Sequence, residues 1–290
     1  MASVRPRRSV LYMPGANARA IEKAKSLACD AVIFDLEDAV SPDQKAMARE
    51  QVADAVRAGG YGRRELIIRI NALASPWGAE DVAAAVAANP HAVLLPKVET
   101  AHEVRALDQA MSAAGAYEDM AIWCMIETPK GVLNAQDIAI SDKRVGAFVM
   151  GTSDLVKDLR ARHTADRTPV LTSLSLSLLA ARAAGIACLD GVYLDLEDEA
   201  GFAAACEQGR DLGFDGKTLI HPKQIDAANQ AFAPSPSDVD HARQVIAAFE
   251  AAEAEGKGVA VLDGKLVEVL HVAEARETIT LADAIAERSG

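Results

Sequence analysis

Short apolar runs alternate with longer amphipathic stretches along most of this 290-residue chain, and the pattern is compatible with few folds. The runs recur about every 25–40 residues, the size of one strand–helix unit in a parallel sheet. Eight runs read as strands buried on both faces: Ser9–Met13, Ala31–Leu36, Glu65–Ile70, Ala92–Leu95, Ala121–Ile126, Gly146–Met150, Gly191–Leu194 and Lys217–Ile220. Helical periodicity fills the gaps, at Ala18–Leu27, Asp43–Val56, Glu80–Ala88, Ala101–Ala113, Thr172–Ala184 and Glu199–Leu212.

Eight strands that alternate with helices predict a parallel sheet closed into a (β/α)8 TIM barrel, which we place over residues 1–230. An open doubly wound sheet would typically have fewer strands and a glycine-rich first turn. The chain contains neither GxGxxG nor GxxxxGK[ST], which argues against the usual dinucleotide and P-loop sites.

The pattern changes near residue 231. We expect a charged helix at Asp238–Glu255, then a hairpin of residues 259–262 and 265–267 with a type I′ turn at Asp263-Gly264, and a last helix from Val269 to about Glu287. The apolar face of this segment is too small for independent folding. Residues 231–290 are therefore expected to pack on their own barrel or on a neighbouring subunit, as a lid and oligomerisation extension.

Charge and cysteine usage narrow the class of protein. The net charge of −12 argues against a nucleic-acid partner and against binding to an anionic membrane surface. The four cysteines share no metal or redox spacing, which is typical of reduced cysteines in a cytosolic protein. The first apolar stretch breaks at Pro14-Gly15, too early for a signal peptide or a membrane span. We expect a cytoplasmic enzyme with a small-molecule substrate.

Polar side chains follow the predicted strands, where barrel enzymes carry their chemistry. Inward-pointing charges cost several kcal/mol each unless they are paired, so their presence on so many strands predicts a polar, functional mouth. The residues are Asp35, Glu37, Asp38, Arg69, Asn71, Lys97, Glu99, Glu127, Asp154, Asp195 and His221.

Glu127 and Asp154 predict a metal site. Each follows one of two consecutive apolar runs, and parallel neighbouring strands would bring both carboxylates to the same sheet edge. No His or Cys at ligand spacing lies nearby, so a hard cation such as Mg²⁺ is favoured. A structural alternative stays open, in which Glu127 caps a helix and Asp154 ends a strand in solvent.

Several of these segments together resemble the citrate lyase β-subunit and malyl-CoA lyase family, within the HpcH/HpaI aldolase superfamily of Mg²⁺-dependent barrels. The resemblance spans nearly the whole chain in order and is specific to fold and superfamily, but much less specific to substrate. The matching segments are Arg8–Gly15, Phe34–Asp38, Arg69–Asn71, Leu95–Glu99, Ile126–Thr128, Gly151–Asp154 and Gly216–Gln224.

The resemblance implies roles for the matched residues. Glu127 and Asp154 correspond to the metal ligands, and Arg69 to the arginine that binds the carboxylate of a keto or hydroxy acid, as a guanidinium does through paired charge-assisted bonds. Backbone N–H groups of Gly151, Thr152 and Ser153 could bind the same carboxylate. Glu37 and Asp38 resemble an acidic pair that holds metal-bound water or Arg69.

The extension departs from the family pattern at one position. Family members assemble as trimers or hexamers, in which this extension closes a neighbouring subunit's mouth and delivers a catalytic Asp. This chain has Glu268 there, one methylene longer, and a shift of about 1 Å in a catalytic group can cost on the order of 10²-fold in rate. The segment also resembles members that hydrolyse the malyl-CoA thioester. A solvated Glu268 that opens a helix is the structural alternative.

The leading functional hypothesis is a Mg²⁺-dependent lyase that cleaves malyl-CoA or citramalyl-CoA to a 2-oxo acid and acetyl-CoA by a retro-Claisen reaction, with Glu268 or Glu37 handling protons. One alternative is a malyl-CoA thioesterase. Another is a citrate lyase β-type subunit that works only in a larger complex with an acyl carrier protein.

Three further hypotheses concern basic residues and one histidine. Arg8, Arg19 and Lys45 could bind the CoA phosphates. A Schiff-base aldolase would use Lys97 or Lys217 as its nucleophile. His221 follows the last predicted strand, and we expect it to hold a loop by hydrogen bonds rather than to bind substrate.

Overall fold

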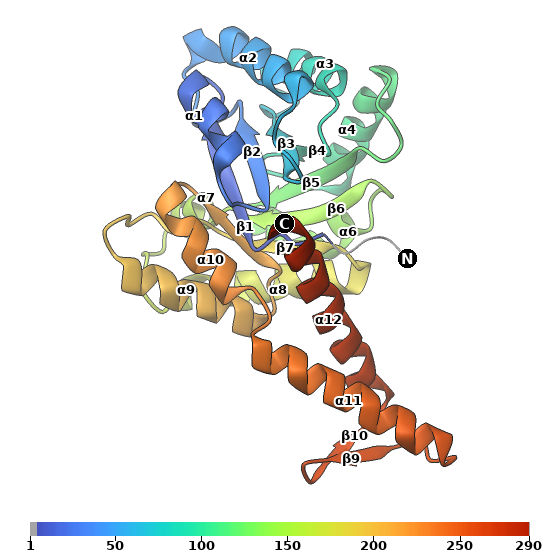
Figure 1. Ribbon diagram of the computed structural model, residues 1–290. Coiled ribbons are helices and arrows are strands. Elements are labelled where there is room, and N and C mark those ends of the chain that lie inside the picture. The colour runs from blue at the N-terminus through green and yellow to red at the C-terminus, as the bar shows by residue number, and fades with distance from the viewer. Residues whose placement is uncertain (1–4, 290) are drawn as a thin grey trace. The chain divides into compact units, whose positions relative to one another are not determined.

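The computed structural model describes residues 5–289 and has a closed barrel of eight parallel strands in chain order (Figure 1). Strand β1 pairs with β8 and closes the sheet, as the sequence predicts. The strands are β1 (Ser9–Pro14), β2 (Ala31–Asp35), β3 (Glu65–Arg69), β4 (Ala92–Leu95), β5 (Ala121–Ile126), β6 (Val145–Met150), β7 (Ala187–Asp190) and β8 (Gly216–Leu219).

Helices connect the strands and surround the barrel (Figure 1). Local signals set their ends. Helix α4 begins with a capping box between Thr100 and Glu103, and α9 ends at Gly213, whose φ of 103° favours glycine. The helices are α1 (Ala18–Lys23), α2 (Lys45–Ala58), α3 (Gly78–Ala88), α4 (Ala101–Ala113), α5 (Pro129–Leu133), α6 (Ala135–Ala139), α7 (Thr152–Asp158), α8 (Thr168–Ala184), α9 (Glu199–Leu212) and α10 (Ile225–Ala231).

On β1, β2, β3 and β5 the residues that face the barrel interior become more polar toward the carboxyl end of the strand. The barrel interior holds a cluster that includes Val10, Ile33, Ile67 and Trp123. Side chains alternate between the two faces of a strand, so residues two or four positions later point inward nearer the carboxyl end. Those positions are Tyr12 on β1, Asp35 on β2, Arg69 on β3, and Met125 with Glu127 on and after β5. The sequence thereby places a polar layer above an apolar core.

Strand β7 was wrongly placed from the sequence. It runs from Ala187 to Asp190, four residues before the predicted start at Gly191, and Leu194 is exposed in the following loop. The apolar pattern misleads here because the strand ends in a fully buried charge: Asp190 lies 2.8 Å from Lys217 Nζ and 2.7 Å from Arg167 Nη1. In a sequence, a charged residue usually indicates a boundary outside a buried strand, so the strand was predicted to begin after Asp190.

The chain from Phe232 belongs to a second compact unit, distinct from Arg7–Ala231. Its elements are α11 (Pro236–Ala254), β9 (Ala260–Leu262), β10 (Lys265–Val267) and α12 (Val269–Ser289). The predicted hairpin is present, and Asp263 and Gly264 have φ of 49° and 75°, as a type I′ turn requires. Val245, Phe249 and Val272 belong to a small apolar cluster within this unit. The lid function assigned to it stays a prediction.

Among residues 5–289, no helix combines the length and apolar character needed to cross a bilayer.

Candidate active site

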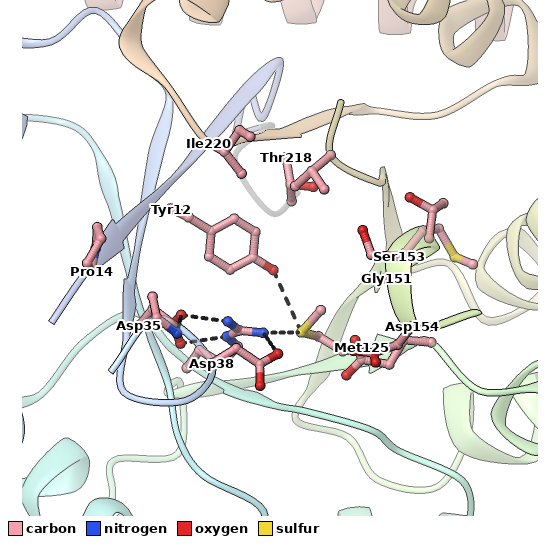
Figure 2. A pocket seen from close by; sticks show the side chains of 16 residues that line it. Tyr12, Pro14, Asp35, Asp38, Met125, Gly151, Ser153, Asp154, Thr218 and Ile220 are labelled. Carbon is pink, nitrogen blue, oxygen red and sulfur yellow. Dashed lines mark hydrogen bonds and ion pairs between the residues drawn. The ribbon is translucent and has the colours of Figure 1, made fainter. Parts of the chain in front are cut away.

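A cavity of about 420 Å³ opens at the carboxyl ends of the strands (Figure 2). Most of the residues predicted for the site line it: Asp38, Arg69, Glu127, Gly151, Thr152, Ser153 and Asp154. Asp35, which the sequence placed in the polar mouth without an individual role, lines it as well, as do Tyr12 and Met125, to which the sequence assigned no function. The cavity therefore brings together the groups predicted to bind a metal and a carboxylate.

Arg69 is buried and held mainly by Asp35. Its Nε and Nη2 lie 2.7 and 2.6 Å from the two Asp35 carboxylate oxygens, and Nη1 lies 2.8 Å from Glu37 Oε2 as an ion pair without hydrogen-bond geometry. Asp38 is more distant, at 3.8 Å. Burial disfavours the charged form of Arg69, but its neighbours, Asp35 foremost, outweigh burial, and the net pKa of Arg69 is raised.

The acidic pair Glu37 and Asp38 was expected to hold metal-bound water or Arg69. Glu37 does pair with Arg69, but the principal partner of Arg69 is Asp35. The sequence held a signal for it, because Asp35 lies two residues after Ile33 on the inward face of β2. Asp35 and Arg69 are also paired in register between β2 and β3. Parallel neighbours therefore place opposite charges side by side, which position along the sequence alone does not reveal.

Glu37 links Arg69 to Lys97. Glu37 Oε1 accepts a hydrogen bond of 2.5 Å from Lys97 Nζ, which also lies 3.7 Å from Asp38 and 3.9 Å from Asp154. Burial raises the pKa of Glu37, and the charges of Arg69 and Lys97 offset this only in part. The two basic side chains thus share one row of carboxylates along the rim of the cavity.

Glu127 follows β5, and only 2% of it is exposed. Its Oε1 accepts a hydrogen bond of 2.8 Å from the backbone N–H of Lys97, and burial raises the pKa of Glu127 to about 7. The helix-capping alternative is wrong, because Thr128 caps α5 by accepting from the Gly131 N–H. A buried carboxylate with so few donors is suited to a cation.

Gly151 and Asp154 lie beside Glu127. A Cβ atom at Gly151 would overlap the Glu127 side chain, so glycine permits the chain after β6 to approach that carboxylate. Asp154 lies in the first turn of α7 and lines the same cavity. Lys97 contacts both acids, through its amide to Glu127 and its ammonium to Asp154. The two acidic residues therefore share one rim.

The two carboxylates of Glu127 and Asp154 fit Mg²⁺ better than a metal that the protein alone must coordinate. Among residues 5–289 no three His, Cys, Asp or Glu side chains converge as a ligand group. Mg²⁺ is typically held by one or two carboxylates while substrate and water complete its octahedron. Glu127 and Asp154 supply that number of carboxylates. A structural zinc site would need four protein ligands.

Two of the three residues predicted to bind CoA have other partners. Arg8 precedes β1, at the opposite end of the barrel from the cavity, and pairs with Asp30 at 2.8 Å. Lys45 is buried, and its Nζ donates to the Leu36 and Glu37 carbonyls and to Asn71. The structure therefore gives no support to either assignment, and sequence alone does not show which basic residues are buried in ion pairs or carbonyl clusters. Arg19 is exposed on α1 and stays a prediction.

The structure gives no support to a Schiff-base lysine. Lys217 is 1% exposed and paired with Asp190. Burial lowers the pKa of Lys97, but the hydrogen bond and charge of Glu37 outweigh it, and the net pKa is raised. Lys97 therefore stays protonated, whereas a nucleophilic amine must be neutral.

His221 and Glu268 lie in different units. His221 Nδ1 accepts from the Lys223 N–H at 3.1 Å and caps a short helical turn, which agrees with the expected loop-holding role. Glu268 follows β10 in the second compact unit, and its side chain is exposed. Its catalytic role stays a prediction.

Comparison with known proteins identifies the family. The HpcH/HpaI aldolase/citrate lyase family model matches residues 8–222. The chain belongs to this family. A (3S)-malyl-CoA thioesterase from Cereibacter sphaeroides is 50% identical over 97% of this chain and 96% of the relative. Citrate lyase subunit beta from Escherichia coli is 39% identical over 96% of this chain and 94% of its own.

A solved family structure, CitE from Mycobacterium tuberculosis in complex with magnesium, acetoacetate and coenzyme A, matches with a TM-score of 0.78 and 28% identity. The match covers 98% of this chain and all of that one. Family membership and these relatives make this chain an enzyme of the CoA-ester lyase and thioesterase group. The particular reaction is taken up below.

Proposed function

We propose that this protein hydrolyses the thioester of malyl-CoA, or of a close 2-hydroxy acid analogue, in a Mg²⁺-dependent reaction that releases malate and CoA. The observation that carries this choice over the lyase reaction is the 50% identity to a (3S)-malyl-CoA thioesterase along nearly the whole chain. The cavity supports the same substrate class, because carboxylates for a divalent cation and an arginine for a carboxylate line one space.

Glu127 and Asp154 would hold the cation. Magnesium in the solved CitE complex supports this choice of metal, as does the all-oxygen donor set here. When bound, Mg²⁺ supplies Lewis-acid chemistry and positive charge beside substrate oxygens.

Arg69 would bind the carboxylate of the hydroxy acid. Asp35 occupies Nε and Nη2, so a ligand would bind Nη1, which now lies beside Glu37 and donates to Met125 Sδ. The backbone N–H groups of Gly151, Thr152 and Ser153 border the same space and would add donors. These contacts would orient the substrate and place its thioester within the cavity.

Hydrolysis then adds water to the thioester carbonyl carbon. A carbon–oxygen bond forms, the carbon–sulfur bond breaks, the sulfur leaves as the CoA thiol, and one proton is released overall with the new carboxylate. Glu37, next to Arg69 and Lys97, or Glu268 from the second unit would accept the proton from water. Asp38, which also lines the cavity, would help to hold these basic groups, and Arg19 would contact the CoA phosphates.

Carbon–carbon cleavage is the second candidate, and the 39% identity to citrate lyase subunit beta favours it. The same bound substrate would lose its hydroxyl proton, the bond between C2 and C3 would break, and protonation of the resulting enolate would give acetyl-CoA and glyoxylate. A subunit that accepts only carrier-bound acyl groups is the third. All three begin with the same bound hydroxy acid, so they differ in products or carrier and not in the proposed metal site.

Product analysis separates the candidates. The protein is incubated with (3S)-malyl-CoA and Mg²⁺, and malate, free thiol, glyoxylate and acetyl-CoA are quantified. We expect malate and CoA in equal amounts, and no product after EDTA treatment. Glyoxylate with acetyl-CoA would instead establish the lyase reaction, and turnover only with an acyl carrier protein would establish the subunit. Arg69→Gln should be inactive, whereas Arg57→Gln, on the exposed face of α2, should match the wild type.

We also propose that the chain forms a homo-oligomer, a trimer or hexamer, in which the second unit of one subunit closes the cavity of another. Light scattering coupled to gel filtration measures the mass directly, and a monomer would contradict the proposal. Mixing Arg69→Gln with Glu268→Gln subunits tests the exchange, because only shared sites would restore activity.

A further inference from the structure

Tyr12 projects from β1 into the cavity (Figure 2), which Arg69 also lines. Its ring packs against the guanidinium, with 5.1 Å between the Arg69 Cζ and the ring centroid. Burial raises the pKa of the Tyr12 hydroxyl more strongly than Arg69 lowers it. The hydroxyl is therefore a neutral donor at physiological pH.

The present acceptor of the Tyr12 hydroxyl is weak. The hydroxyl donates to Met125 Sδ at 3.7 Å, and Arg69 Nη1 donates to the same sulfur at 3.5 Å. A thioether sulfur is a poor acceptor compared with an oxygen. Two strong donors thus converge on one soft atom, and all three side chains line the cavity, so an oxygen ligand beside the sulfur would make better hydrogen bonds with both.

We propose that Tyr12 is a substrate-binding residue, whose hydroxyl donates a hydrogen bond to the carboxylate of the hydroxy acid bound by Arg69. This inference rests on the proposed function and adds to it a residue to which neither the sequence motifs nor the comparisons assign a role. A carboxylate has two oxygens with several lone pairs, so it can accept from the guanidinium and the phenol together. The pair of donors would favour ligands with a carboxylate over those with a neutral group at that end.

The test compares malate binding in two tyrosine variants. Tyr12→Phe keeps the ring and its contact with Arg69 and removes only the hydroxyl. Tyr61→Phe is the matched control, because Tyr61 is also buried and packs on Phe34, its hydroxyl donates to the Ile21 carbonyl, and it does not line the cavity. (S)-Malate is titrated into each protein at saturating Mg²⁺ by calorimetry, and thermal unfolding is followed in parallel.

We expect Tyr12→Phe to weaken malate binding by about tenfold or more, the scale of a hydrogen bond to a charged acceptor, with Tm within about 2 °C of the wild type. Tyr61→Phe should bind malate like the wild type. Unchanged affinity in Tyr12→Phe, with binding lost in Arg69→Gln, would overturn this inference and leave the proposed function standing. A Tm far below the wild type would also overturn it, because the hydroxyl would then serve the fold. A wild-type protein that does not bind malate would overturn both.

Discussion

Asp35 and Arg69 form a two-point ion pair between neighbouring strands, with separations of 2.7 and 2.6 Å between the guanidinium nitrogens and the carboxylate oxygens. Both residues are buried, and their backbones are in register between β2 and β3. The pair fixes the plane of the guanidinium, and it leaves Nη1 directed toward Met125, Glu37 and the cavity. An arginine held in this way loses little further freedom when it binds a carboxylate.

Asp35→Asn should destabilise the protein and abolish malate binding. The substitution removes the main partner of a buried guanidinium, and breaking a buried ion pair typically costs about 3–5 kcal/mol. Urea denaturation measures the loss. Asp54→Asn is the control, because Asp54 pairs with Arg57 on the surface of α2, where such pairs contribute about 0–1 kcal/mol. Equal stability and equal malate affinity in the two variants would contradict the assigned role of Asp35.

Asp190 should account for part of the stability at neutral pH. Burial alone would raise its pKa, but Lys217 and Arg167 outweigh burial and lower the pKa. A lowered carboxyl pKa stabilises the fold above the unfolded-state value, and that contribution is lost as the pH falls through the folded-state value. The free energy of unfolding of the wild type should therefore fall as the pH drops below about 4, the usual pKa of an unfolded Asp.

In Asp190→Asn the free energy of unfolding should be lower at pH 7 and should fall less in acid. Urea denaturation at several pH values gives both curves, and Asp211→Asn, which alters an exposed carboxylate, serves as the control. Parallel curves for Asp190→Asn and the wild type would show that another group controls the acid transition.

Gly151→Ala should weaken Mg²⁺ binding. The added methyl group would overlap the Glu127 side chain, and overpacking of this kind costs about 1–3 kcal/mol. Either the Glu127 carboxylate moves or the β6–α7 segment does. Calorimetric titration with Mg²⁺ detects the change. Gly258→Ala, where a Cβ would lie in open space, should bind Mg²⁺ like the wild type, and an unaffected Gly151→Ala would show that this close approach is unimportant.

Lys45→Met should destabilise the segment that carries Glu37. The Lys45 ammonium donates to two carbonyls and to Asn71 Oδ1, and each buried acceptor left without a donor costs about 1–3 kcal/mol. Urea denaturation should reveal this loss, whereas Lys23→Met, at an exposed position of α1, should change stability little. A Lys45→Met protein as stable as the wild type would show that water replaces the ammonium.

The barrel and the acidic rim were predictable because their signals are local. Seven strands lie within one residue of their predicted bounds, since short apolar runs bounded by turns are distinctive. The meeting of Glu127 and Asp154 at one end of the barrel was predictable, because each follows such a run and parallel strands bring successive carboxyl ends to one edge.

The remaining features depend on partners far apart in sequence. The position of β7 was missed because Asp190 is a charged residue inside the barrel. Residues from β8 and the start of α8 neutralise its charge, and neither is near it in sequence. The pairing of Asp35 with Arg69 and the burial of Lys45 against backbone carbonyls both depend on residues distant in sequence. The position of Tyr12 beside Arg69 could not be predicted either, because it depends on which strands lie near β1 in the barrel.

Calorimetric titration of Mg²⁺ into the wild type, Asp154→Ala and Asp158→Ala tests the metal site most directly. Asp158 lies on the same helix as Asp154, is exposed, and does not line the cavity. We expect Asp154→Ala to fold normally and to lose Mg²⁺ affinity by more than the 10–100-fold typical of residues that only support metal ligands, together with its activity, while Asp158→Ala matches the wild type. Wild-type Mg²⁺ affinity in Asp154→Ala would contradict the proposal that this carboxylate and Glu127 hold the cation.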